Sequence, residues 1–426
     1  MKEIPYWIDT APAFPDRSDR PLPAEGIDVA VVGGGITGLN AAIRLVRKGG
    51  STVVLEQGRF GSGASGRNGG QCNTGITVGL QTAIGRYGLA AARTYHNAYR
   101  EAVDFVESLV RTEGIDCNFR RVGRLGVAFK PAHHEHQRAT QKLLAEQFDH
   151  ETILLSAADL RAELGSTYYH GGLLEPLSAG LHPAKYVRGL AEVAERSGAR
   201  LYENAKVTTV QRAPGGRFHL RTPRGAVSAR QVLLATDGYT DGTFAWLRRR
   251  MVVVGSFIIA TEPLGDALAR EIIPRARMVV DTKHIGHYYR LSPDNRLLFG
   301  GRARFALSNP ASDRKSAKVL QRDMLQVFPQ LAGTRIDYAW GGHVGFTFDR
   351  MPHAGQVGGL YYSMGYCGHG VQMASLMGAR MAEIMDGHPE ANPWRQLKAR
   401  VLPTYSGTAW FLPFVGTYFR VKDWLS

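Results

Sequence analysis

Short apolar runs alternate with helical repeats along the chain, and several of these runs end in glycines or small polar residues. The first apolar run covers residues 28–32 and leads into a glycine-rich turn. Beyond the turn, apolar positions recur at the spacing of one helix face, and a second apolar run follows at residues 52–55. Apolar runs without polar alternation indicate strands buried on both faces, as in a parallel sheet. The pattern therefore predicts a strand, a helix and a parallel strand over residues 28–55.

The turn after the first strand has the spacing of a dinucleotide-binding motif. Gly33, Gly35 and Gly38 form a G-x-G-x-x-G pattern, which allows a tight turn and lets the backbone approach a pyrophosphate. The following helix starts near Ile36, so its free N–H groups would point at that anion. Glu56 ends the second strand, where a carboxylate accepts hydrogen bonds from a ribose. An ordinary loop could carry the glycines alone, but the complete strand–helix–strand context predicts a dinucleotide site.

Two more glycine-rich segments have the character of a binding site. Residues 61–71 are too rich in glycine for regular structure, and successive backbone N–H groups of such a loop can cradle a phosphate or line a planar ring. Residues 365–370 lie between a predicted strand at 360–364 and a predicted helix at 371–385. A protein that binds only NAD would not account for this second turn, so such a protein is disfavoured.

The middle of the chain has the pattern of a second domain. Apolar strands at 251–260, 288–291 and 297–300, with a helix at 313–328, predict an antiparallel sheet. A long amphipathic helix is expected at 90–112.

The two ends of the chain differ from the rest in composition. Residues 1–26 contain five prolines among polar residues, which predicts an irregular arm that lies across the surface. Residues 401–426 are rich in aromatic side chains. Packing of this tail against the body is favoured over contact with a membrane surface, because the tail has no clear basic face.

Composition narrows the classes of protein to consider. A chain of 426 residues can bury a large core and is expected to hold two domains. The formal charge of +15 favours anionic partners, but the arginines are scattered, so nucleic acid is not expected as a partner. Three cysteines cannot form a disulfide framework, which favours a cytoplasmic, reducing location. No signal peptide, transmembrane segment or metal site is predicted.

The glycine turns, their order and the loop at 63–71 together resemble the FAD-dependent oxidoreductases of the D-amino acid oxidase and sarcosine oxidase family, especially its bacterial γ-glutamylputrescine oxidases. The likeness extends over nearly the whole chain, through residues 288–291, 294–298, 328–331, 350–352 and 368–371. It implies an α/β fold in which a Rossmann-type FAD-binding domain carries an inserted antiparallel-sheet substrate domain. The expected boundaries are 1–90, 181–240 and 339–395 for the FAD-binding domain, 91–180 and 241–338 for the substrate domain, and 396–426 for the aromatic tail.

The resemblance also implies a role for each cofactor-binding segment. The pyrophosphate would meet Gly33, Gly35, Ile36, Thr37 and Gly38 and would lie near Thr236, the adenosine ribose would meet Glu56 and Gln57, and the adenine would meet Val207. The phosphates and the isoalloxazine would meet Gly63, Ala64, Ser65, Arg67, Asn68, Gly69 and Gly70. The pyrimidine edge of the flavin would meet Gly368, His369, Gly370 and Val371, where a helix N-terminus stabilises the negative charge of reduced flavin.

The activity implied by the resemblance is oxidation of an amine or amino acid, with a role in polyamine catabolism as one expectation. Hydride would pass from the carbon next to nitrogen to the flavin, water would hydrolyse the imine, and O2 would take the electrons to give hydrogen peroxide. The candidate substrate residues are Tyr289, Arg290, Trp340, His343, Tyr366 and His369, although Tyr289 and Arg290 could be ordinary sheet residues and Trp340 a core residue. A carboxylate on the substrate could be selected by Arg302 or Arg304.

Departures from the family pattern leave alternatives open. Residues 340–343 contain no cysteine, where covalently flavinylated sarcosine oxidases have one, so dissociable FAD is expected. The oxygen-activating lysine of sarcosine oxidases is replaced by an apolar residue near Leu298. The chain could therefore be a dehydrogenase that passes electrons to a quinone, and a flavin-binding protein without turnover is a further alternative. The oligomeric state is not predicted.

Overall fold

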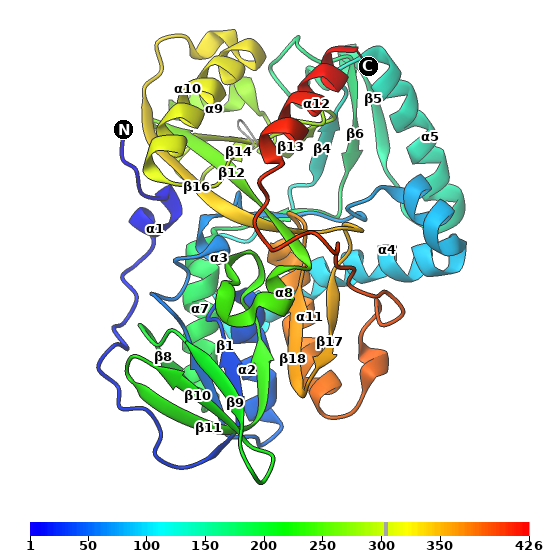
Figure 1. The fold of residues 1–426 in the computed structure, drawn as a ribbon. Coiled ribbons are helices and arrows are strands. Elements are labelled where there is room, and N and C mark those ends of the chain that lie inside the picture. Colours follow the sequence, from blue (N-terminus) through cyan, green and yellow to red (C-terminus); the bar gives the residue numbers. More distant parts are fainter. Residues whose placement is uncertain (302–305, 426) are drawn as a thin grey trace.

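The computed structural model describes residues 1–301 and 306–425 (Figure 1). The predicted strand–helix–strand unit is present as β1 (Ile27–Val32), α2 (Ile36–Arg47) and β2 (Thr52–Leu55), and β1 and β2 pair in parallel. Both strands are almost entirely buried, as their unbroken apolar sequences predict. The glycine turn therefore leaves the carboxyl end of a central strand, which is where parallel sheets bind ligands.

The first sheet assembles strands from distant parts of the chain. Its strands run in the order β17, β18, β11, β1, β2, β8, and a β9–β10 hairpin extends from β11. The strands from β8 onward are β8 (Arg200–Tyr202), β9 (Thr209–Arg212), β10 (Phe218–Thr222), β11 (Gly225–Leu234), β17 (His353–Val357) and β18 (Leu360–Met364). One face packs on α2, α4 (Leu80–Glu113), α7 (Pro183–Arg196) and α11 (Gly370–Met385), whose apolar sides form one continuous core.

The second sheet is mostly antiparallel, as the sequence predicts, except that β13 and β4 are parallel. Its order is β16, β12, β15, β14, β13, β4, β6, β5. These strands are β4 (Arg124–Val127), β5 (Ile153–Ser156), β6 (Gly171–Glu175), β12 (Met251–Thr261), β13 (Met278–Asp281), β14 (His287–Leu291), β15 (Leu297–Gly301) and β16 (Ile336–Thr347). Alternate side chains point to opposite faces, so one face packs its apolar residues with those of α6 (Ala157–Leu160), α9 (Gly265–Ile272) and α10 (Pro310–Val327).

The remaining elements are one long helix and several shorter segments. The long helix α4 starts ten residues before the predicted position and has a non-helical residue at Gly88. The remaining elements are α3 (Ala64–Arg67), β3 (Gln71–Cys72), α5 (Pro131–Phe148), β7 (Ala179–Gly180), η1 (Asp237–Tyr239), η2 (Gly242–Phe244), α8 (Ala245–Arg248), η3 (Pro329–Leu331), η4 (Pro389–Ala391) and α12 (Leu412–Leu425). Among the described residues, no helix has both the length and the apolar character needed to cross a membrane.

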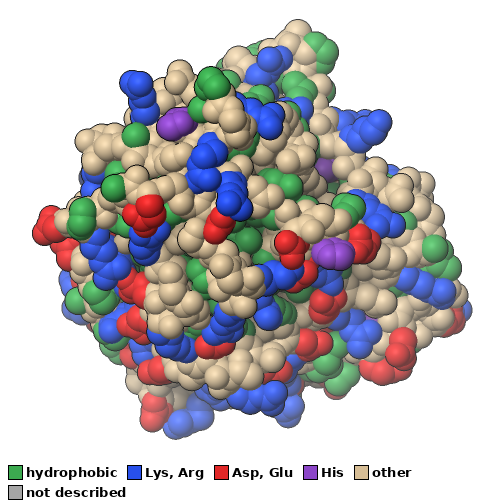
Figure 2. Space-filling view, turned by 90° about the horizontal axis from the view of Figure 1, so that it is seen from below, with side chains coloured by type: hydrophobic (Ala, Val, Ile, Leu, Met, Phe, Trp, Pro, Cys, Tyr) green, Lys and Arg blue, Asp and Glu red, His purple; other side chains and the backbone are tan. Residues whose placement is uncertain are grey.

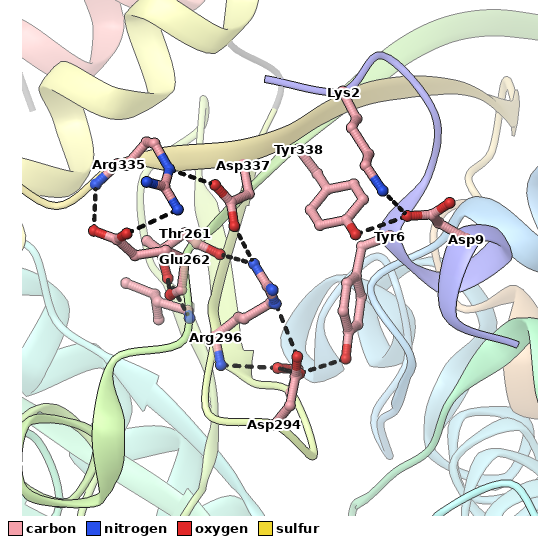
Figure 3. A network of polar contacts seen from close by, with 12 residues as sticks. Lys2, Tyr6, Asp9, Thr261, Glu262, Asp294, Arg296, Arg335, Asp337 and Tyr338 are labelled. Carbon is pink, nitrogen blue, oxygen red and sulfur yellow. Dashed lines mark hydrogen bonds and ion pairs between the residues drawn. The ribbon is translucent and has the colours of Figure 1, made fainter.

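The amino-terminal arm is irregular and mostly exposed over residues 11–26, as its prolines predict, but its first ten residues are more ordered. It contains α1 (Tyr6–Thr10), and the side chains of Tyr6 and Trp7 are buried. Lys2 pairs with Tyr338 at the edge of β16, and the hydroxyl of Tyr6 donates to Asp294 (Figure 3). The first residues of the arm therefore pack against the second sheet, where the buried side chains of Tyr6 and Trp7 anchor them.

Arg296 is the centre of the polar network that receives the arm. Its guanidinium donates to Asp294 at 2.8 Å, to Asp337 at 2.7 Å and to the carbonyl oxygen of Thr261 at 2.8 Å (Figure 3). Because Asp294 also accepts from Tyr6, the network joins α1 to three strands or turns of the second sheet. On the molecular surface, basic and acidic side chains are interspersed over the face shown in Figure 2.

The carboxyl-terminal tail only partly follows the expectation of packing against the body. Asp423 accepts hydrogen bonds from the backbone N–H groups of His284 and Ile285. Trp410 and Phe414, however, each expose 71% of their surface. The helix α12 is thus attached through Asp423 to the turn between β13 and β14, and large aromatic side chains of the tail face solvent.

Candidate cofactor and active site

A cavity of about 430 Å³ lies between the two sheets. Its floor comes from the carboxyl ends of β1, β2 and β11 and from the starts of α2, α3 and α11. Its roof comes from the second sheet, through residues of β4, β12, β13, β14 and β16. All three glycine-rich segments found in the sequence therefore reach one cavity.

Two long helices direct their amino-terminal ends at this cavity. The residue before α2 is Gly35, which has no side chain, and the residue before α11 is His369, whose side chain does not cap the helix. Neither helix has an acidic residue in its first turn. Each end carries the partial positive charge of its first N–H groups, although that of Ile36 already donates to Ser65 Oγ, so the floor favours an anionic or electron-rich ligand.

The glycines of the first turn leave no room for side chains. Gly33 has a φ of +108°, and a Cβ atom there would lie 2.7 Å from the carbonyl oxygen of Ala235. A Cβ at Gly38 would lie 2.0 Å from the carbonyl oxygen of Gly33, and a Cβ at Gly35 would lie 2.7 Å from Ser65 Oγ. The turn thus requires glycine, and its bare backbone faces the cavity as a pyrophosphate cradle does.

Glu56 lies beside this turn with its carboxylate buried. It accepts hydrogen bonds from the backbone N–H groups of Gly34 at 2.8 Å and Gly58 at 2.9 Å. Burial raises the pKa of Glu56, and these hydrogen bonds counteract part of that effect. The side chain lines the cavity, and so do Gln57 and Val207, so the residues expected to contact the ribose and the adenine share one cavity.

The loop at 63–71 is held from behind by two tryptophans. The indole N–H of Trp7 donates to the carbonyl oxygen of Asn68, and that of Trp340 donates to the carbonyl oxygen of Arg67, both at 2.8 Å. On the other side, Ser65 Oγ accepts from the N–H of Ile36 at 3.0 Å and links this loop to the first turn. The loop is consequently fixed on both sides, although it contains little regular structure.

The third glycine segment is fixed by buried polar groups. Asp237 Oδ1 accepts from the N–H of Gly365 at 2.7 Å, and burial raises the pKa of this carboxyl. The hydroxyl of Tyr366 lies 2.9 Å from Thr37 Oγ1 and 2.8 Å from Ser363 Oγ. Tyr366 therefore connects the start of α2 to the segment before α11, and its hydroxyl already has two polar partners.

Two histidines reach the cavity in their neutral form. Burial and the nearby Arg124 lower the pKa of His369 to about 4, and its Nδ1 lies 3.2 Å from Thr77 Oγ1. Burial also lowers the pKa of His343, whose ring lies 5.1 Å from that of Tyr239. Both side chains line the cavity, so they can orient a ligand through hydrogen bonds without adding positive charge at pH 7.

Most residues predicted to bind the cofactor line the cavity. They are Gly33, Gly35, Ile36, Thr37, Glu56, Gln57, Gly63, Ala64, Ser65, Arg67, Asn68, Gly69, Val207, Thr236, Gly368, His369, Gly370 and Val371. Gly38 and Gly70 lie behind this lining, where their missing side chains allow close packing of the backbone. The described residues form continuous walls of backbone N–H groups and polar side chains, which fit an elongated dinucleotide such as FAD.

The predicted substrate residues separate into two groups. His343, Tyr366 and His369 line the cavity. Tyr289 and Trp340 are fully buried and do not line it.

Arg290 also lies outside the lining, because its guanidinium donates to the carbonyl oxygens of Gly70 and Leu181. The prediction that Tyr289, Arg290 and Trp340 contact the substrate is therefore not supported, because none of them lines the cavity. Arg290 and Trp340 instead support the loop at 63–71. The suggested Arg302 and Arg304 lie outside the described residues.

The two-residue period of a strand explains the error at Tyr289. Tyr288 and Tyr289 point to opposite faces of β14, and Tyr289 packs in the core with Phe299 and Phe328. Tyr288 faces the cavity, where its hydroxyl lies 2.9 Å from Ser256 Oγ. The sequence showed a strand here but did not show which of its faces met the cofactor.

Other lining residues were missed as well. They include Asn73, Arg124, Asp237, Tyr239 and Ser256. One signal was available for Arg124, because Leu125 and Val127 alternate as the apolar face of their strand. Arg124 therefore had to point to the opposite face, and a charged residue on the inner face of a sheet is a candidate for ligand binding.

Comparison with known proteins agrees with this geometry. Residues 28–384 match the family described as FAD dependent oxidoreductase. A γ-glutamylputrescine oxidoreductase of Escherichia coli K12 is 37% identical over 369 residues, which cover 85% of this chain and 84% of that protein. A probable oxidoreductase OrdL of Haemophilus influenzae is 35% identical over 372 residues, which cover 86% of this chain and 84% of that protein.

A crystal structure with the same fold is that of glycine oxidase from Geobacillus kaustophilus. It matches with a TM-score of 0.71 and covers 85% of this chain and 95% of that protein. The identity is 18%, so this likeness concerns the fold. The predicted mixed α/β fold is thereby confirmed.

Proposed function

The chain belongs to the FAD-dependent oxidoreductase family, and from this premise we propose that it oxidises an amine or amino acid at the carbon next to nitrogen. The enzyme is an FAD-dependent oxidoreductase, and its 37% identity to a γ-glutamylputrescine oxidoreductase supports a substrate of that chemical kind. Dioxygen is the proposed electron acceptor, with hydrogen peroxide as the reduced product. The imine product would be released to hydrolysis, and we propose the cytoplasm as the site of action.

The observation that carries the proposal is the single cavity shared by both sheets. Its floor holds the residues for the cofactor, and its roof brings side chains such as Tyr288 and Ser256 over the same space. Bound FAD supplies the hydride acceptor for the carbon next to the amine nitrogen. A substrate enclosed between floor and roof would lie against the flavin ring if the segments at 65–69 and 368–371, which both contribute to the lining of this cavity, hold the ring as proposed.

The chain's own contribution is to bind, orient and desolvate the amine. Hydride leaves most readily from a carbon next to a neutral amine, and an enclosed pocket disfavours the charged ammonium form. His343 and His369 are neutral and can accept a hydrogen bond from such an amine. Tyr288 and Tyr239 add aromatic walls, which hold an apolar substrate segment in one orientation.

We propose that FAD is held without a covalent bond. Among the described residues, Cys367 is the one cysteine that lines the cavity. Burial raises the pKa of Cys367 to about 12, and its thiol donates to the carbonyl oxygen of Gly365 at 3.1 Å. A thiol in this state is a poor nucleophile for attachment to a flavin. Flavin that remains on the polypeptide after acid precipitation would contradict this proposal.

A second proposal concerns the electron acceptor. The lysine that lines the cavity within the described residues is Lys206, and it is paired with Asp241 at 2.8 Å. Leu298 is buried. The described lining thus offers no unpaired lysine to assist reaction with O2, which supports a dehydrogenase with another acceptor as the alternative.

One experiment tests these proposals in sequence. Purified protein should be yellow, and its flavin should bleach when a suitable amine or amino acid is added without air. The first compounds to add are γ-glutamylputrescine and N-substituted amino acids. Return of colour in air together with peroxide supports the oxidase, whereas colour that returns only with a quinone supports the dehydrogenase. Failure of every amine and amino acid to bleach a flavin-loaded protein would refute the proposed activity.

A further inference from the structure

We propose that the outer side of the carboxyl-terminal helix α12 docks on the surface of an anionic phospholipid bilayer. The contact is made by the aromatic face of the tail, which consists of Trp410, Phe414, Tyr418 and Val421. This inference is independent of the proposed amine oxidation. It follows from the exposure of the aromatic face and from the basic side chains at both ends of the helix.

The aromatic face is a continuous stripe of exposed apolar side chains. Phe414, Tyr418 and Val421 are spaced by four and three residues, so they lie along one side of α12, and Trp410 precedes Phe414 by four positions. Tyr418 exposes 62% of its surface, and Trp410 and Phe414 are exposed to a similar extent. Aromatic side chains of this size are seldom left in water, and a stripe of them marks a site of contact with another surface.

The opposite side of α12 is fixed to the body of the protein. Leu412 is buried, and the ring of Phe419 lies 5.5 Å from that of His284. Asp423 accepts hydrogen bonds from the N–H groups of His284 and Ile285. The helix lies on the outside of the second sheet (Figure 1), so these contacts hold the aromatic face toward solvent.

Basic side chains lie beside the segment that leads into α12. The Nε atoms of Arg248 and Arg249 donate to the carbonyl oxygens of Gly407 and Tyr405, both at 3.1 Å. Within the described chain, neither arginine forms an ion pair with a carboxylate. Backbone carbonyls do not neutralise a guanidinium, so this end of the helix keeps its positive charge.

The carboxyl end of α12 also lies among basic groups. Burial lowers the pKa of His133, and the neighbouring Lys130 and His284 lower it further through their charge. Lys283 lies 4.1 Å from the centroid of an aromatic ring and has no carboxylate as an ion-pair partner among the residues described. The acidic neighbour, Asp423, is already engaged by two backbone N–H groups. Positive charge therefore predominates at this end as well.

An anionic bilayer matches both features of this surface. Tryptophan, tyrosine and phenylalanine side chains enter the boundary between headgroups and acyl chains, and basic side chains beside them attract anionic headgroups. The tail showed no basic face in its own sequence because the positive charge comes from α8, from the turn between β13 and β14 and from the start of α5. A second copy of the chain fits less well, because a two-fold contact through α12 would bring the same basic groups together.

The test is flotation of flavin-loaded enzyme with vesicles made of equal parts of phosphatidylglycerol and phosphatidylcholine. We expect the wild type to float with these vesicles and to bind vesicles of phosphatidylcholine alone more weakly. The double substitution Phe414→Ser/Tyr418→Ser should weaken binding to the mixed vesicles roughly 10-fold or more, because it removes two aromatic side chains from the contact. Val357→Ser is the control, because Val357 is an exposed apolar residue on β17 of the first sheet and should leave binding unchanged.

A second pair of variants tests the contribution of charge. Arg249→Gln should weaken binding to the mixed vesicles roughly 5-fold and should leave binding to phosphatidylcholine vesicles nearly unchanged. Arg230→Gln removes the same charge from an exposed position on β11 and should bind both kinds of vesicle as the wild type does. Added salt should weaken the binding of the wild type to the mixed vesicles.

Two results would overturn the proposal. One is wild-type enzyme that does not float with the mixed vesicles, and the other is equal binding by the wild type and Phe414→Ser/Tyr418→Ser. A wild-type dimer that the double substitution dissociates, without any binding to vesicles, would assign the aromatic face to a second copy and would also overturn the proposal. The activity assay is separate, so failure of every amine to bleach the flavin would leave this inference untouched.

A further measurement covers the case in which the double variant does not retain flavin. Mixed vesicles that contain brominated phosphatidylcholine should quench the tryptophan fluorescence of the wild type. They should quench Trp410→Phe less, because Trp410 belongs to the aromatic face and is exposed. Absence of quenching in the wild type, or equal quenching in the wild type and Trp410→Phe, would show that the aromatic face does not enter the bilayer.

Discussion

The buried cluster around His287 gives a quantitative prediction for stability. The Nδ1 atom of His287 lies 3.0 Å from Oδ2 of Asp281 on β13, and its Nε2 atom lies 3.2 Å from Oδ2 of Asp323 on α10. Burial and Lys283 lower the pKa of His287, but the hydrogen bonds and charges of the two carboxylates outweigh them and raise it from 6.5 to about 9. The imidazolium therefore joins α10 to the sheet, and the substitution His287→Asn removes that charge.

The contribution of the imidazolium to stability follows from the change in the pKa of His287 on folding. A change of about 2.5 pKa units corresponds to roughly 3 kcal/mol of unfolding free energy. Because the folded pKa lies above the unfolded value, this stabilisation is fully present below pH 6.5 and is lost as the pH rises through about 9. For a chain of 426 residues, roughly 3 kcal/mol corresponds to a melting temperature difference of about 3 to 4 °C.

The assay is thermal unfolding of flavin-loaded protein, followed by circular dichroism at pH 6 and pH 9.5. Between pH 6 and pH 9.5, the melting temperature of the wild type should fall by about 3 to 4 °C more than that of His287→Asn. His219→Asn is the control, because His219 is exposed on β10 and should leave the wild-type pH dependence unchanged. The same loss between pH 6 and pH 9.5 in the wild type and His287→Asn would refute the reasoning, whatever the absolute stability of the variant.

Three further substitutions test the cofactor cradle. Gly38→Ala places a Cβ 2.0 Å from a backbone carbonyl oxygen and should leave little FAD in the purified protein. Gly85→Ala, whose Cβ has no other atom outside its own helix within 4 Å, is the control and should keep the normal ratio of flavin to protein absorbance. Tyr366→Phe removes a hydroxyl 2.9 Å from the threonine in the first turn of α2, and FAD titration should show about 10-fold weaker binding. Trp340→Phe removes the donor to a carbonyl of α3 and should cost about 1 to 3 kcal/mol in urea unfolding. Equal flavin content in the two alanine variants, or unchanged values in the other two, would contradict these roles.

The cofactor half of the site was largely predictable because its residues are contiguous in sequence. The turn at Gly33–Gly38, the loop at 63–71 and the turn at Gly368–Val371 each reach the cavity through their local backbone conformation. A backbone cradle depends on the spacing of its glycines and on the strand and helix on either side, and the local sequence determines all of these. This is why most of the predicted cofactor residues line the cavity.

Three of the six residues predicted to contact the substrate do not line the cavity, and the reason is the geometry of strands. The side chains of the substrate half come from separate strands of one sheet, and a strand presents alternate residues to opposite faces. Choosing Tyr289 instead of Tyr288 was an error of one position, and it moved the choice from the cavity to the core. Trp7 was missed because it lies in the arm, far in sequence from the loop that it supports.

By itself, the sequence predicted a dinucleotide site built from three glycine-rich segments, because the conformations those segments require are local. The tertiary structure decided which side chains share the cavity, since strand register and sheet face depend on partners hundreds of residues away. Arg290 illustrates the difference, because its packing against the backbone of Gly70 and Leu181 makes it a support of the loop. Arg124 lines the cavity opposite Glu175 of the neighbouring strand, and its Nε atom is buried without a hydrogen-bond partner among the described residues, which only the packed structure could reveal.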